Sequence, residues 1–117
     1  MEKVYIADCY ILGTALLYLK ELRLERLELI KSNLIMSGID VSLTPESIEA
    51  AIVEWRDFFA ITDEGSIILN SKVAQNKLLI ELIFCSVLSD RLKSTLLSSI
   101  FNCHKKRILL FPQSKLE

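Results

Sequence analysis

The sequence predicts a mainly α-helical fold with one β-hairpin, and three observations lead to this fold class. Apolar residues recur at helical spacing over most of the 117 residues. Glycine is scarce, with Gly13, Gly38 and Gly65 as the three glycines, which favours long helices with few connections. The segment FFAITDEGSIILN, at residues 58–70, carries alternating apolar residues on both sides of a turn sequence. It predicts a tight hairpin.

Two helices are expected before residue 37. Residues 4–21 are apolar on nearly all sides, as in a helix buried at the centre of a fold or in an interface. Residues 23–36 have leucine and isoleucine at helical spacing and a balanced set of charges between them. Ser37 and Gly38 then provide a stop, because glycine suits the left-handed position beyond a helix C-terminus.

The third helix is expected over residues 45–57, after a β-prone segment at residues 39–43. Thr44 can cap this helix, and Pro45 sits at the first position, where its missing N–H costs nothing. Glu46 faces the positive end of the helix dipole. The apolar residues at the spacing of one core-facing side are Ile48, Ala51, Ile52 and Trp55.

The register of the hairpin follows from its loop. A three-residue loop at residues 63–65, with Gly65 in the left-handed conformation, closes a type I turn with a bulge. Such a hairpin is marginally stable alone, so its apolar face must pack on another element. The loop predicts that Thr62 opposes Ser66, Ile61 opposes Ile67, and Phe59 opposes Leu69.

Helical spacing returns after the hairpin. Residues 72–88 and 91–102 are expected to form either two helices or one long kinked helix. Ser89 and Asp90 are suited to cap the second stretch. Residues 108–111 are β-prone and could form an edge strand or a docking peptide for a partner.

Composition limits the classes of function. Fourteen basic and fifteen acidic residues give a formal charge of −1. The net charge therefore gives the chain no overall electrostatic attraction to nucleic acid or anionic lipid. An apolar content of 51%, with a mean hydropathy of +0.38, indicates surplus apolar surface of the kind found in interfaces. No apolar stretch reaches the roughly 20 residues that a membrane-spanning helix needs.

The three cysteines favour a reducing compartment. Cys9, Cys85 and Cys103 are odd in number and far apart, which disfavours a disulfide framework and predicts a cytoplasmic location. His104 is the single histidine, and a zinc site needs three or four ligands. No phosphate-binding loop or nucleophile motif occurs. We therefore expect no catalytic residues, no cofactor and no metal.

Residues 23–70 resemble a winged-helix domain. In this resemblance residues 23–36 and 45–57 are the helix-turn-helix pair, and residues 59–69 are the wing. The connection at residues 37–44 is longer than the usual turn of three or four residues. The resemblance rests on the order of elements.

The whole chain is expected to form a single domain over residues 1–117. Its winged-helix-like core would carry an additional N-terminal helix, C-terminal helices over residues 72–102, and a tail over residues 103–117.

The resemblance implies DNA binding with the third helix in the major groove, but the charges argue against it. Between Val41 and Gly65 the chain has six carboxylates and one cation, Arg56. Duplex DNA carries a negative charge about every 1.7 Å along its axis and is bound through lysine and arginine. An acidic third helix with an acidic wing tip is better suited to a protein partner.

We therefore expect a non-enzymatic protein–protein interaction module that acts as a homodimer or as a small subunit of a complex. The same acidic residues could equally form an ordinary solubilising face. Trp55 and Phe59 are expected in the core. The expected partner-binding residues are Glu46, Glu49, Val53, Asp57 and Phe58.

The alternative function is a nucleic-acid-binding transcriptional regulator. It would use the basic C-terminal cluster, Lys105, Lys106 and Arg107, together with Arg23, Arg26 and Lys31, in place of the third helix. The simpler structural interpretation is that this cluster is a solvent-exposed helix end, where cations interact favourably with the helix dipole. A weaker third hypothesis is a helical domain that binds a peripheral membrane surface.

Overall fold

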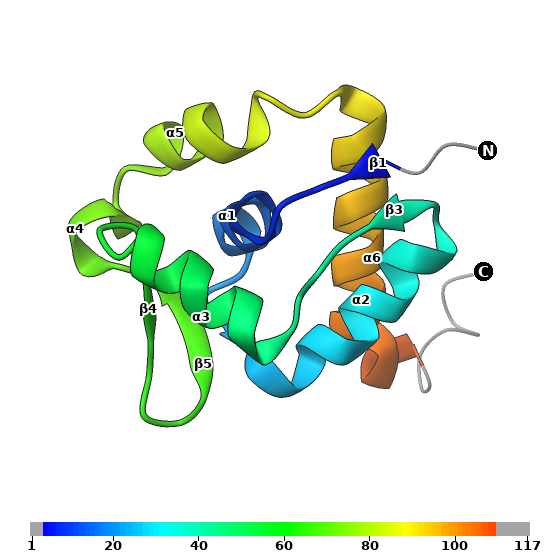
Figure 1. Cartoon of the computed structure of the whole chain (residues 1–117), viewed down its shortest axis with the longest axis horizontal. Helices are drawn as coiled ribbons and strands as arrows, with labels where there is room; N and C mark the ends of the chain where they lie inside the picture. The colour runs from blue at the N-terminus through cyan, green and yellow to red at the C-terminus, as the bar shows by residue number, and fades with distance from the viewer. Residues whose placement is uncertain (1–3, 110–117) are drawn as a thin grey trace.

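The computed structural model of the chain describes residues 4–109, with side chains up to residue 101. The fold is mixed α/β and largely helical, with a three-stranded antiparallel sheet and a short parallel pair of strands. Along the chain the elements are β1 (Val4–Tyr5), α1 (Asp8–Tyr18), β2 (Leu22–Arg23), a 3-10 turn (Leu24–Arg26), α2 (Leu27–Met36), β3 (Ile39–Asp40), α3 (Pro45–Glu54), β4 (Phe59–Ile61), β5 (Ser66–Leu69), α4 (Ser71–Ala74), α5 (Lys77–Ile80), a π-helical turn (Glu81–Cys85) and α6 (Asp90–Leu109) (Figure 1).

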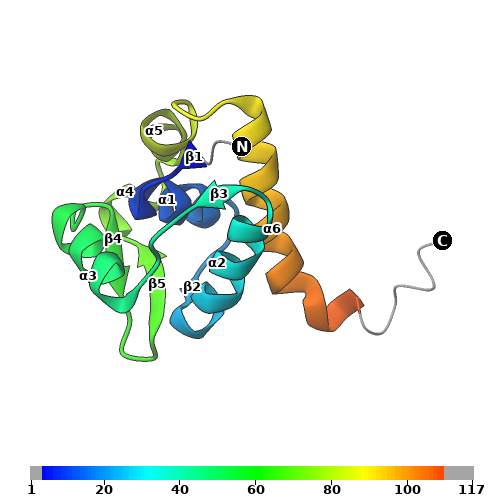
Figure 2. The same cartoon turned by 45° about the vertical axis from the view of Figure 1, so that its right-hand side comes forward.

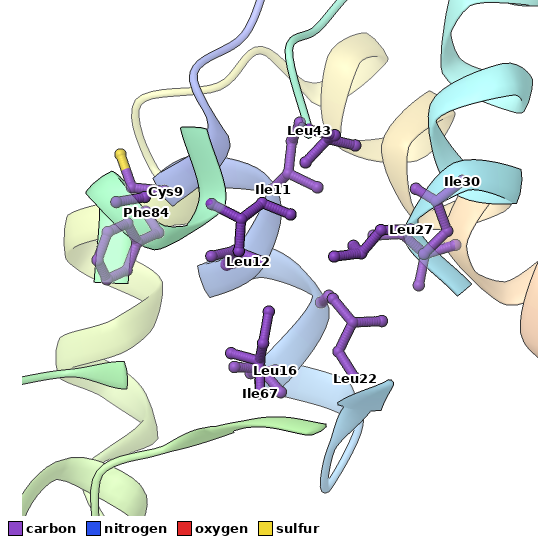
Figure 3. Packing of buried hydrophobic residues seen from close by; sticks show 14 of the residues in the cluster. Cys9, Ile11, Leu12, Leu16, Leu22, Leu27, Ile30, Leu43, Ile67 and Phe84 are labelled. Carbon is purple, nitrogen blue, oxygen red and sulfur yellow. The ribbon is translucent and has the colours of Figure 1, made fainter. Parts of the chain in front are cut away.

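Helix α1 lies at the centre of the fold, with the other elements arranged around it (Figure 1). Ile11, Leu12 and Leu16 are fully buried, and Figure 3 shows them among side chains from β2, α2 and β5. The predicted burial of the first helix is therefore confirmed. The helix begins at Asp8, because Val4 and Tyr5 form a strand instead.

Gly13 allows the π-helical turn to pack directly on α1. A Cβ atom at Gly13 would lie 2.3 Å from Cγ of Phe84, which is closer than two non-bonded carbon atoms can approach. Phe84 is fully buried and is surrounded by the rings of Tyr10, Trp55, Phe58 and Phe59, with centroid distances of 5.1–6.3 Å. This aromatic cluster joins the C-terminal half of the chain to α1, α3 and the hairpin.

The connection between α2 and α3 contains a strand. Gly38 has φ +88°, as predicted for the residue that ends the second helix. Strand β3 then pairs in parallel with β1, so that Val4 opposes Ile39 and Tyr5 opposes Asp40. The extra length of residues 37–44 is therefore used to reach the N-terminal strand.

The hairpin has the predicted register. Ile61 opposes Ile67 and Phe59 opposes Leu69, and Gly65 has φ +83°. Its apolar face is not wholly buried, because Ile61 near the tip is 45% exposed.

A third strand was not predicted. Leu22 pairs antiparallel with Ile67, giving the strand order β2-β5-β4. Because Leu22 and Arg23 belong to this strand and a 3-10 turn follows, the second helix begins at Leu27 and not at residue 23. The sheet packs on α1, with Leu22 and Ile67 buried beside Leu16 (Figure 3).

The helical region after the hairpin is broken and forms separate helices. Residues 86–89 separate the π-helical turn from α6, and the Ser89 hydroxyl accepts a hydrogen bond from the Leu92 N–H at 3.2 Å, as expected for its cap. Leu78 and Leu82 were expected to face inward, but they are 65% and 57% exposed, while Ile80 is fully buried. Ile80 and the fully buried Phe84 are four residues apart, so they lie on one face of a helix, and this face is offset from the one that the apolar pattern indicated.

Helix α6 is longer than predicted and continues to Leu109. Residues 108 and 109 of the β-prone run are therefore helical, and the rest of that run lies outside the described residues.

Candidate protein-binding surface

The N-terminus of α3 is held by a hydrogen-bond network that reaches α1. Thr44 Oγ1 accepts from the Ser47 N–H at 3.0 Å, and Ser47 Oγ accepts from the Thr44 N–H at 2.9 Å, forming a reciprocal capping box. The carboxylate of Asp8, which is 6% exposed, accepts from the Ser47 hydroxyl and from the Leu43 N–H. This network fixes α3, so its outer face is presented on a rigid element.

The outer face of α3 is acidic and partly apolar. Glu46, Glu49 and Val53 are exposed, at the i, i+3, i+7 positions of one helical face. Val53 is 61% exposed. The helix contains no lysine or arginine. The expected exposure of these three residues is confirmed, and Asp57 is exposed in the turn that follows the helix.

Phe58 was expected to be exposed, but it packs against the core. It is partly buried, and its ring lies edge-on to Phe84 and to Trp55, with centroids 5.7 Å apart in both pairs. The prediction of an exposed apolar contact at this position is wrong. The neighbouring Trp55 and Phe59 pack in the core as expected.

An apolar groove lies beside α3. It has a volume of about 290 Å³ and lies between the start of α2, the start of α3 and the hairpin. Among the described side chains, Glu28 and Glu49 are the charged residues that line it, and no lysine or arginine does. The apolar lining residues are Leu24, Leu27, Leu43, Pro45, Ile48 and Ile61.

A second, more open hollow of about 200 Å³ lies on the other side of α3. Tyr5, Cys9, Ala50 and Glu54 contribute to its lining. Burial raises the pKa of the Cys9 thiol, and the negative charge of Glu54 raises this pKa further. A thiol with a raised pKa is a poor nucleophile. The outer face of α3 therefore lies between the apolar groove and this second hollow.

Exposed apolar side chains also occur in α5, in the π-helical turn and in the loop that follows it. Leu78, Leu82 and Val87 are 65%, 57% and 62% exposed. The sequence pattern was interpreted as an inward face at Leu78 and Leu82, so the exposure of these two residues was not predicted.

The groove itself was also not predicted. Its residues come from the turn after β2, from α2, from the segment before α3, from α3 itself and from β4. These elements are far apart in the sequence, so no local spacing marks the groove. The signal in the sequence was the surplus of apolar residues in the chain as a whole.

Other predicted features fall partly outside the described side chains. The backbone of Lys105, Lys106 and Arg107 belongs to α6, but their side chains are not among those described. Within residues 4–109, no helix has the length and apolar character required to cross a membrane. Among the side chains that the structure describes, no three from His, Cys, Asp or Glu lie together as potential metal ligands.

No protein-family model matches the chain, and searches of curated proteins and of solved structures give no significant match.

Proposed function

We propose that the chain is a winged-helix-like protein–protein interaction module that binds its partner through the outer face of α3 and the adjoining groove. The observation that carries this proposal is the combination of an apolar groove with an acidic, cation-free helix at its edge. Interfaces combine an apolar centre with charged groups that select the partner. The partner surface is accordingly apolar at its centre and basic at its rim.

The order of elements supports the winged-helix part of the proposal. Helices α2 and α3 are followed directly by the β4–β5 hairpin, which is the order that the resemblance implies. The third strand and the strand-bearing connection at residues 37–44 are this chain's own additions. Fold alone does not define function, so the charge of α3 carries the argument for protein binding.

A comparison of purified complexes tests the proposal. A tagged chain expressed in its native cells is purified after nuclease treatment, and co-purifying proteins are quantified by mass spectrometry. We expect a stoichiometric protein companion that is lost in the Glu46→Lys/Val53→Lys variant, because the charge and the apolar contact both change. The matched control is Glu21→Lys/Gln75→Lys, at exposed positions away from α3. Equal recovery with both variants would refute the proposed surface.

A further inference from the structure

We propose that the groove beside α3 binds the basic C-terminal segment of a second copy of this chain, residues 105–111. This inference rests on the proposed function, since it names the partner of the same surface. Cations of Lys105, Lys106 and Arg107 face the groove's carboxylates in this arrangement, and the apolar residues 108–111 enter the groove.

The charge of the groove selects a basic occupant. Glu28 and Glu49 border it and, in the described part of the chain, neither forms an ion pair. No lysine or arginine among residues 4–101 lines the groove. A cation brought to the edge of an apolar cavity interacts more strongly with such carboxylates than it would in bulk water. The two carboxylates therefore favour lysine or arginine from a partner.

The apolar part of the groove selects an occupant with apolar side chains next to its cations. Leu24 and Ile61 at the border of the groove remain 36% and 45% exposed, so apolar surface is left uncovered there. A volume of about 290 Å³ is at the lower end for a small-molecule pocket. It suits a few branched side chains inserted from a peptide, as in other peptide-binding grooves.

One stretch of the sequence has the required chemistry. Residues 105–107 are the chain's single run of three consecutive cations, and they are followed by Ile108, Leu109, Leu110 and Phe111.

The direction of α6 argues for a second copy. Asn33 of α2 donates from Nδ2 to the Ser99 carbonyl oxygen at 3.5 Å, so α6 packs on the Asn33 side of α2. Asn33 lies about 140° around the helix axis from Glu28, at 3.6 residues per turn. Helix α6 therefore leaves on the side of α2 turned away from the groove, and its C-terminal end runs away from α3 and the hairpin (Figure 2). The segment would have to reverse its direction to reach the groove of its own chain, whereas the groove of a neighbouring copy requires no reversal.

Reciprocal exchange gives a closed pair. If each copy places its segment in the groove of the other, the contact is two-fold symmetric and ends at a dimer.

Charge reversal in the full chain tests this inference, with mass measured by size-exclusion chromatography and light scattering at low salt. We expect a dimer for the unmodified chain and monomers for both Glu28→Lys/Glu49→Lys and Lys105→Glu/Lys106→Glu. The variant that carries all four changes is expected to regain the dimer, because the opposite charges are paired again. Circular dichroism verifies that each variant is folded, and Glu21→Lys/Glu81→Lys is the charge-matched control, which stays dimeric.

Three other results would overturn the inference. A monomeric unmodified chain, a groove variant that remains dimeric, or a fourfold variant that remains monomeric is incompatible with it. If the chain is monomeric but a different protein is lost with Glu46→Lys/Val53→Lys, the inference fails and the proposed function stands. If neither a dimer nor a companion protein is found, both fail.

Discussion

The Ser47 hydroxyl donates a hydrogen bond of 2.5 Å to Oδ2 of Asp8, joining the first turn of α3 to the first turn of α1. Asp8 is the only charged residue among the buried residues in the described part of the chain. Because its other oxygen accepts from the Leu43 N–H, one carboxylate fixes both the helix and the segment that leads into it. The outer face of α3 depends on this network for its orientation.

Replacement of Asp8 tests the network. Asp8→Ala leaves the Ser47 hydroxyl and the Leu43 N–H without their buried acceptor, and we expect a loss on the order of 2–4 kcal/mol in the free energy of unfolding. The measurement is urea denaturation. Asp57→Ala, at an exposed position, is the control and should cost less than about 0.5 kcal/mol. Equal losses in the two variants would show that the network adds nothing to stability.

The contact between Gly13 and Phe84 gives a second prediction. Gly13→Ala introduces a methyl group where 2.3 Å is available, so we expect a loss of about 1–3 kcal/mol or more from overpacking. Gly38→Ala is the matched control, since its added Cβ meets nothing within 4 Å and only its φ of +88° is strained. In a Phe84→Ala background, which lacks the Cγ and Cδ2 atoms that the new methyl group meets, Gly13→Ala should cost less than it does in the unmodified chain. An equal cost in both backgrounds would show that the clash with this ring is not the cause.

Ile80 and Leu82 test which face of the helical region after the hairpin is inward. Ile80→Ala should cost about 2–5 kcal/mol in the free energy of unfolding, because the side chain is fully buried. Leu82→Ala should change the free energy of unfolding by less than about 0.5 kcal/mol, since Leu82 is 57% exposed. The sequence pattern predicted Leu82 inside, so the reverse ranking in thermal or urea denaturation would favour the predicted inward face.

Much of the local structure could be predicted because its causes are local. Thr44 and Pro45 define the start of α3 by their own chemistry, and Gly65 defines the hairpin loop by its left-handed conformation. The exposure of Glu49 and Val53 follows from helical spacing once the start of α3 is known.

Long-range features could not be predicted in this way. The pairing of Val4 with Ile39 and of Leu22 with Ile67 joins residues far apart in the chain, and neither pair has a sequence pattern of its own. The inward face at Ile80 and Phe84 could not be distinguished from the neighbouring face at Leu78 and Leu82, because residues 78–84 are apolar except at Glu81. The groove is lined by residues from α2, α3 and the hairpin, so it follows from the packing of these elements in the structure.

Nucleic-acid binding is the rival function and can be measured directly. With no cation on α3, we expect that Arg56→Gln does not change the binding of a fluorescent DNA duplex at low salt, measured by anisotropy. If duplex binding occurs at all, it should be lost in Lys105→Gln/Lys106→Gln/Arg107→Gln and fall steeply with salt. Tight, salt-sensitive binding that survives this triple change would contradict the assignment of α3 to a protein partner.

Photo-crosslinking from α3 in native cells tests the central claim most directly. A photoreactive amino acid is placed at Glu49, at the edge of the groove, and in a second variant at Gln75, an exposed position outside α3 and the groove. We predict a discrete protein crosslink from position 49, identified by mass spectrometry, and none of comparable yield from position 75. Absence of a protein crosslink at position 49, or equal crosslinking at both positions, would contradict a protein-binding surface on α3.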